Sequence, residues 1–174
     1  MSSALKGAQA SAPVENAGAV SWDLGDSFNL RLLIHYVGDI HQPLHATSRY
    51  TSAYPDGDRG GNSFKLTSKN GVSNLHSLWD SVLFEYSTDM SQPLSTTDWD
   101  YLGTESARLT KLYPESSFTN LFNSYAEWDD ESLEIATSFV YEGITENTVP
   151  SAEYIQNGLV LIEKQLCKPG FRLA

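Results

Sequence analysis

The sequence has a single cysteine, Cys167, so no disulfide can form within the chain, and a small scaffold held together by disulfides is excluded. No run of about 18 apolar residues is present to cross a bilayer. The N-terminal region contains no apolar stretch typical of a signal peptide, and no Asn-x-Ser/Thr acceptor for N-glycosylation occurs. Composition therefore says little about where the protein works.

Basic residues are also scarce: 11 lysines and arginines stand against 22 aspartates and glutamates, and the formal net charge is −11. This balance excludes a groove that holds nucleic acid by lysine and arginine alone. It does not exclude a phosphate ligand, because a bound metal ion can supply the local positive charge. The 174 residues, 40% hydrophobic with four tryptophans, suffice for one packed domain.

The spacing of apolar residues predicts a mostly helical chain. Helices are predicted over residues 24–42, 74–86, 96–112, 117–143 and 151–167, with Asn74 as the N-cap of the second and with Pro43 and the sequence KPGF as stop signals. A long loop is expected over residues 46–62, and Asn70-Gly71 predicts the turn of a short hairpin. We therefore predict an all-α fold, with residues 1–21 as a flexible N-terminal arm and residues 22–174 as one domain.

All four histidines lie between residues 35 and 76. His35 and Asp39 are four residues apart on the first predicted helix, and His76 and Asp80 repeat this spacing on the second. His45 follows shortly after the proline that stops the first helix. A single pair of this kind is more often packed in a core, and the first helix is apolar nearly all round, which predicts burial.

Two such pairs and a further histidine favour a metal site over simple core packing. Imidazole and carboxylate ligands suit zinc; three ligands with an open position indicate a catalytic site, and four closed ligands a structural one. The candidate ligands are His35, Asp39, His45, His76 and Asp80. On an ideal helix His41 projects about 200° around from Asp39, so we predict that it supports the site or the core without binding the metal.

Three segments resemble a known family: LLIHYVGDIHQPLH at residues 32–45, DRGGN at 58–62 and NLHSLWDS at 74–81. Their order and spacing resemble those of the fungal and plant single-strand-specific, zinc-dependent nucleases, which share an all-α fold with bacterial zinc phospholipase C. The segment WDDESLEIA, which begins at Trp128, and the closing GFRLA are similar to later parts of the same family. The resemblance covers residues 24–174.

The resemblance implies a zinc endonuclease that cuts single-stranded DNA or RNA, leaves 5′-phosphate products and carries up to three zinc ions. By the same resemblance, His35 and Asp39 are ligands of the paired zinc sites. His45, His76 and Asp80 hold the zinc that keeps an open position, and Asn62 contacts the nucleotide. The resemblance also implies a secreted protein, although no signal peptide is visible in this chain.

Other parts of the family pattern have no counterpart here: the amino-terminal tryptophan that binds zinc, further histidine and aspartate ligands, and an aspartate that orients the attacking water. The chain thus resembles the C-terminal half of the family domain, with one complete zinc site and no catalytic residue assigned beyond the ligands. Four alternatives stay open. The chain is a fragment or an incompletely determined sequence of a nuclease, or a nuclease that another chain completes or covers. It could instead be a non-catalytic zinc-stabilised structural or assembly protein, or a zinc phospholipase C, against which IHQPLH and the Gly-Gly-Asn loop weigh.

Overall fold

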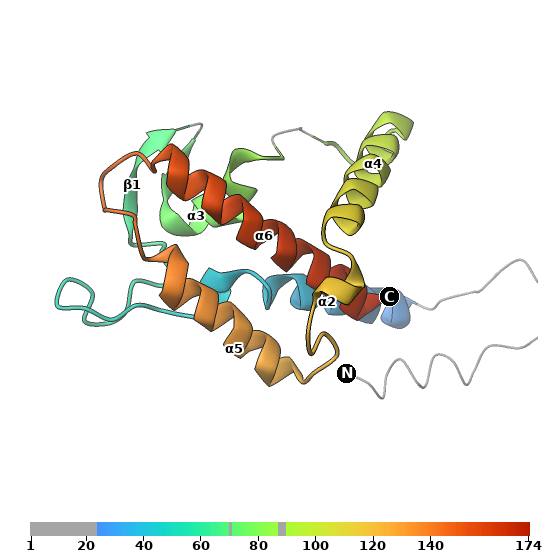
Figure 1. Ribbon diagram of the computed structural model, residues 1–174, viewed down its shortest axis with the longest axis horizontal. Coiled ribbons are helices and arrows are strands. Elements are labelled where there is room, and N and C mark those ends of the chain that lie inside the picture. Colours follow the sequence, from blue (N-terminus) through green and yellow to red (C-terminus); the bar gives the residue numbers. More distant parts are fainter. Residues whose placement is uncertain (1–23, 70, 87–89) are drawn as a thin grey trace, which may run out of the picture. The chain divides into compact units, whose positions relative to one another are not determined.

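The computed structural model describes residues 24–69, 71–86 and 90–174, and the chain divides into two units, Met1–Asp39 and Ile40–Ala174. The described helix of the first unit is α2, Leu24–Asp39. The second unit contains η1 (Pro43–His45), β1 (Lys65–Lys69), β2 (Val72–Asn74), α3 (Leu75–Asp80), η2 (Val82–Phe84), α4 (Thr96–Leu112), η3 (Glu115–Ser117), α5 (Tyr125–Ile135), η4 (Ala136–Val140) and α6 (Ala152–Leu173) (Figure 1). The all-α prediction is confirmed, whereas the predicted arm at residues 1–21 lies outside the described residues.

The helix α2 ends at Asp39, three residues before the predicted end at 42, because the chain turns before it reaches Pro43. The predicted burial is wrong for most of this helix, although Val37 is only 5% exposed. Leu30 and Ile34 expose 37% and 52% of their surface, and Phe28 and Tyr36 are exposed as well. A single helix with apolar residues on all sides needs neighbours on every side to bury them, and α2 is the described helix of its unit. None of the described helices is long and apolar enough to cross a membrane.

Polar caps explain where the other helices begin. The side chain of Asn74 accepts a hydrogen bond from Ser77 N at 2.8 Å, which confirms the predicted cap of α3. α4 occupies the predicted range and begins with a capping box between Ser95 and Asp98. A second capping box, between Ser124 and Glu127, starts α5 at Tyr125 and not at the predicted residue 117. The helix that is predicted to extend to residue 143 ends instead in the short π-helix η4, at Val140.

The predicted hairpin is present: β1 and β2 pair antiparallel, and Gly71 has a positive φ of 81°. α3 is shorter than predicted, because Val82, Leu83 and Phe84 take left-handed backbone angles just after Ser81. This reversal places Leu83 in the core, where its side chain packs against Gly158 of α6. Any side chain at residue 158 would displace Leu83, since a Cβ there would lie 2.5 Å from the Leu83 Cδ1 atom.

The core of the second unit lies between α3, the hairpin and α6. Leu75, Leu78 and Trp79 of α3 are at most 1% exposed, and they belong to one cluster with Phe64, Leu66, Leu83, Val140, Tyr154 and Ile162. The Trp79 indole donates to the Tyr154 hydroxyl at 3.0 Å, and that hydroxyl donates to the Val140 carbonyl at 2.7 Å. Burial raises the pKa of Tyr154, so the hydroxyl keeps its proton for this bond. The core thereby fixes α3, the helix that carries His76 and Asp80.

The helix α6 continues to Leu173, past the predicted end at residue 167, and Pro169 lies inside it. A proline removes one backbone hydrogen bond from a helix interior. The last turn is held from outside, because Arg172 donates to the Leu121 carbonyl at 2.6 Å and to the Glu131 carboxylate at 3.1 Å. These contacts compensate for the local cost of Pro169, which explains why KPGF does not stop the helix.

Candidate metal centre

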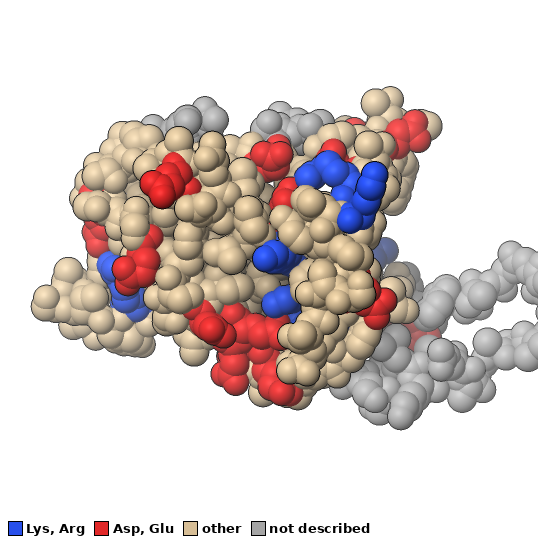
Figure 2. All heavy atoms as spheres, viewed as in Figure 1, with Lys and Arg blue, Asp and Glu red and all other residues tan. Residues whose placement is uncertain are grey.

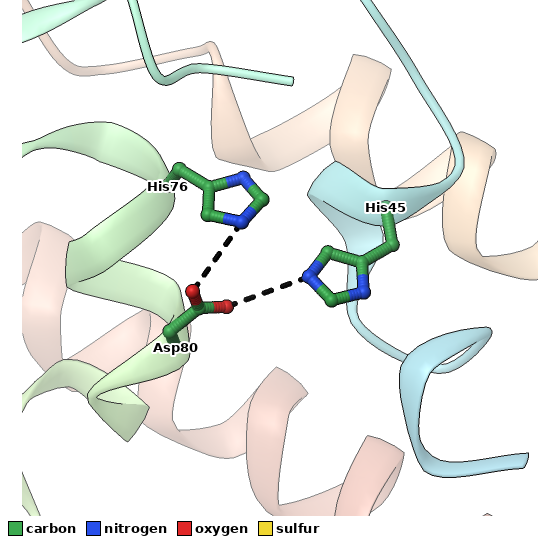
Figure 3. A group of neighbouring side chains, drawn as sticks. All are labelled: His45, His76 and Asp80. Carbon is green, nitrogen blue, oxygen red and sulfur yellow. Dashed lines mark ion pairs between the residues drawn. The ribbon is translucent and has the colours of Figure 1, made fainter. Parts of the chain in front are cut away.

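His45, His76 and Asp80 form the group among the described residues that could hold a metal ion, with one ligand atom from each lying within 4.8 Å of the others. The Asp80 carboxylate faces both imidazoles: its Oδ1 atom lies 3.6 Å from His45 Nε2, and its Oδ2 atom lies 3.3 Å from His76 Nε2 (Figure 3). The two rings are stacked with centroids 5.1 Å apart. All three side chains are partly open to solvent.

Local structure explains why these side chains meet. His45 ends the short helix η1, which starts at Pro43 and is capped by the Gln42 side chain. His76 and Asp80 lie four residues apart on α3 and therefore share one helix face. Since Leu44 and Leu75 are both buried in the same core, the two segments are brought side by side. The ligand group thus stands on elements that the core holds in place.

The Nδ1 atom of His76 shows which ring nitrogen is available to a metal ion. His76 Nδ1 lies 2.8 Å from the Gly60 carbonyl oxygen, which can only accept a hydrogen bond, so Nδ1 carries the proton. In the neutral ring, Nε2 then presents its lone pair to the Asp80 carboxylate, which is also an acceptor. A cation between them, either a proton or a metal ion, satisfies both groups. This arrangement, a histidine ligand whose other nitrogen donates to a carbonyl, is typical of metal sites.

The distances also fit a metal ion of the size of zinc. Ligand atoms about 2.1 Å from a tetrahedral ion lie roughly 3.4 Å from one another. The separations of 3.3 Å and 3.6 Å, each measured to a different oxygen of Asp80, are close to that value, and one ligand atom from each of the three residues lies within 4.8 Å of the others. Two imidazole nitrogens and one carboxylate oxygen leave a fourth position for water or substrate, as in catalytic sites. The residues present therefore fit a three-ligand metal centre.

The other predicted ligands form a separate pair in the first unit. His35 Nε2 lies 3.2 Å from Asp39 Oδ2 on α2, as the spacing of four residues predicts; the side chain of His35 is largely exposed and that of Asp39 is partly exposed. The structure thus brings together three of the five predicted ligands in one unit and the remaining two in the other.

His41 lies in the core and not in the ligand group. It is 2% exposed; its Nε2 atom contacts the Arg172 guanidinium, and its ring packs against Trp128. The His41 backbone carbonyl accepts a hydrogen bond from Gln165 at 3.0 Å. His41 therefore ties the ligand-bearing segment to α6.

The loop at residues 46–62 is anchored by a buried carboxylate. Asp58 is fully buried; its Oδ1 atom accepts from Arg49 N at 2.9 Å, and its own N donates to the Arg49 carbonyl at 3.0 Å. The Arg49 guanidinium lies over the rings of Phe64 and Tyr141 at 4.9 and 4.8 Å. This anchoring holds the glycines that follow Asp58 against α3. Asn62, the predicted nucleotide contact, donates to the Arg59 carbonyl at 2.9 Å and so is part of the same loop structure.

Replacing Gly60 with alanine is expected to lower the free energy of unfolding by roughly 1–3 kcal/mol and to weaken metal binding. Gly60 has a φ of +61°, and a Cβ there would collide with the Leu44 carbonyl oxygen, so the carbonyl that binds His76 would shift. Urea unfolding measures the loss. Gly71→Ala is the matched control, because its φ is +81° with open space around it. Equal losses in the two variants would show that the close approach at Gly60 does not matter.

Two residues of this centre were missed by the sequence prediction. Gly60 belongs to the DRGGN motif, and nothing in its residue type indicates that its backbone carbonyl would accept a hydrogen bond from His76. Gln42 donates from Nε2 to Asp80 Oδ1 at 2.8 Å. Its position just before Pro43, at the start of a turn between two histidines, is the sequence signal that could have indicated a supporting role.

Comparison with known proteins finds similar sequences among nucleases. Endonuclease 4 of Arabidopsis thaliana is 32% identical over 159 residues, which cover 83% of this chain and 48% of that protein. Endonuclease 3 of the same plant is 31% identical with the same coverage. Nuclease S1 of Aspergillus oryzae is 25% identical over 155 residues, which cover 83% of this chain and 51% of that protein. The chain spans about half the length of the curated relatives it matches.

The match to a protein family is more extensive than any of these pairwise similarities. It runs over residues 4–174 and includes both histidine-bearing segments and the loop between them. It also agrees with the resemblance inferred from the three sequence motifs. The chain therefore belongs to the S1/P1 nuclease family.

Proposed function

We propose that His45, His76 and Asp80 bind zinc and that this centre serves the hydrolysis of phosphodiester bonds in single-stranded DNA or RNA, giving 5′-phosphate products. The observation that carries the proposal is the geometry of His76, whose Nδ1 proton is committed to Gly60 and whose Nε2 faces a carboxylate. Family membership supports the nuclease reaction, and the donor set supports zinc among the common metals.

When bound, zinc would lower the pKa of a coordinated water and place a positive charge next to the scissile phosphate. The chain needs this charge, because its own net charge is −11. On the face shown in Figure 2, acidic side chains gather over α5, where Glu127, Asp129 and Asp130 are exposed. Phosphate groups are repelled by such a surface. His45 and His76, as neutral imidazoles, bind the metal without reducing its charge, and Asp80 contributes a single negative charge.

The remaining predicted residues complete the proposal. We expect His35 and Asp39 to provide further zinc ligands, since they present an imidazole and a carboxylate at 3.2 Å. Asn62 directly follows Gly61, whose carbonyl accepts from the His76 backbone N–H at 3.4 Å. The Asn62 amide is therefore next to a residue that contacts the His76 backbone, and we expect it to orient a nucleotide at the centre.

Because the chain covers about half of its relatives, we further propose that full activity requires polypeptide equivalent to the rest of those proteins. That polypeptide would supply the additional zinc ligands expected from the family, either as another chain or as further sequence of the same protein. Secretion, which the family resemblance implies, is part of the same proposal.

The proposal is tested with a single-stranded oligonucleotide labelled at its 3′ end, incubated with the zinc-loaded chain. A second reaction adds the separately produced N-terminal half of Endonuclease 4. Cleavage that EDTA abolishes, and that Asp80→Asn reduces by at least 100-fold, is the expected result in the second reaction. The new 5′ ends should be substrates for a 5′-phosphate-dependent exonuclease.

Two outcomes contradict the proposal in different ways. Tight zinc binding without EDTA-sensitive cleavage in either reaction would indicate a zinc-stabilised structural protein. Release of phosphorylated headgroups from phospholipid vesicles, with no cleavage of the oligonucleotide, would indicate a phospholipase.

A further inference from the structure

Gln42 joins the two segments that carry the metal ligands. Its Oε1 atom accepts a hydrogen bond from Leu44 N, which caps η1 just before His45. Its Nε2 atom donates to Asp80 Oδ1 at 2.8 Å, so both ends of one planar amide are used. The Gln42 backbone carbonyl also accepts from His45 N at 2.9 Å. A single residue therefore contacts the turn before His45 and the carboxylate at the end of α3.

The bond to Asp80 affects one oxygen of the carboxylate more than the other. Oδ1 accepts the hydrogen bond from Gln42 Nε2, while Oδ2 faces His76 Nε2 at 3.3 Å. A carboxylate held by a hydrogen-bond donor on one oxygen cannot rotate freely about its last bond. This bond matters for Asp80, because its side chain is 47% exposed and its contacts with the two histidines, at 3.3 and 3.6 Å, are longer than the bond from Gln42.

We propose that Gln42 is a positioning residue for the metal centre: it fixes the rotation of the Asp80 carboxylate and the distance from Asp80 to His45. The inference rests on the proposed function, since it assumes that Asp80 is a metal ligand. Groups that orient a ligand from outside typically contribute 10–100-fold to metal affinity. Gln42 has no contact with the metal in this scheme and acts through the Asp80 carboxylate and through the turn that precedes His45.

The test compares zinc affinity in the full chain, measured by competition with a chromogenic chelator, for wild type and Gln42→Ala. We expect the variant to bind zinc about 10–100-fold more weakly. The control is Gln156→Ala, an exposed glutamine of α6, which should leave the affinity within twofold of wild type. The absorption spectrum of the Co²⁺-loaded protein provides a second measurement, because a change in the orientation or position of a ligand changes the d–d bands, whereas a loss of stability alone does not.

The outcomes separate this inference from the proposed function. Tight zinc binding by wild type and equally tight binding by Gln42→Ala, with the same Co²⁺ spectrum, overturns the role of Gln42 and leaves the zinc site standing. Absence of zinc binding by wild type overturns both. A lower thermal stability of the metal-free variant with unchanged zinc affinity and spectrum would show that Gln42 only caps η1, and this too overturns the inference.

Discussion

Replacing His76 with alanine is expected to abolish tight zinc binding, with a loss in affinity of more than 100-fold. The expected loss exceeds the 10–100-fold typical of groups that only orient a ligand, because a ligand atom itself is removed and two ligands remain. Zinc per chain after dialysis should fall from near one to near zero. Thermal unfolding gives an independent measurement, since zinc at about 100 times its Kd stabilises the folded state by roughly 2.7 kcal/mol.

The matched variant for this prediction is His35→Ala. His35 pairs with Asp39 on α2 and lies outside the group of three, so the tight zinc should be retained. Zinc content that stays unchanged in His76→Ala would refute the ligand assignment. The reverse result, with zinc lost only in His35→Ala, would move the principal site to α2.

Replacing Arg172 with methionine is expected to lower the free energy of unfolding by roughly 3–5 kcal/mol. The Arg172 side chain is fully buried; it lies over the Trp128 ring at 4.5 Å and donates to both oxygens of Glu131 at 3.1 Å. Burial alone would raise the pKa of Glu131, but Lys168 and Arg172 outweigh it and hold that pKa below its usual value. Removing Arg172 leaves a half-buried carboxylate with Lys168 as its remaining cation and leaves the Leu121 carbonyl without this donor.

Two further variants make this second prediction specific. Arg31→Met changes an exposed arginine of α2 and should alter the free energy of unfolding by less than about 0.5 kcal/mol. Adding Glu131→Gln to Arg172→Met should recover part of the loss, because the buried charge is then removed together with its partner. Urea unfolding followed by circular dichroism measures all of these. A loss below about 1 kcal/mol in Arg172→Met would mean that the cluster behaves like a surface ion pair.

Short-range patterns were sufficient to predict much of the site. The four-residue spacing predicted the His35–Asp39 and His76–Asp80 pairs, and Asn74 predicted the start of the helix that carries the latter. These features depend on helix geometry and on caps, which lie within a few residues of the groups they affect.

The features that could not be predicted depend on residues distant in sequence. The extension of α6 beyond Pro169 depends on contacts of Arg172 with Leu121 and Glu131, about fifty and forty positions earlier. The end of α3 depends on space that Gly158 leaves for Leu83. The contact of Gln42 with Asp80 spans 38 positions and has no periodic signal. Such contacts are decided by packing, which single-sequence patterns do not contain.

The contact between His41 and Arg172 spans 131 positions and has a consequence for the order of events during synthesis. The segment that ends at His45 and the helix α3 are both translated before Arg172, the residue that the buried His41 side chain contacts. Domains fold as units, with N-terminal regions available first. The nascent chain can therefore contain His45, His76 and Asp80 well before Arg172 is made, but His41 can form its buried contact only after translation has passed residue 172.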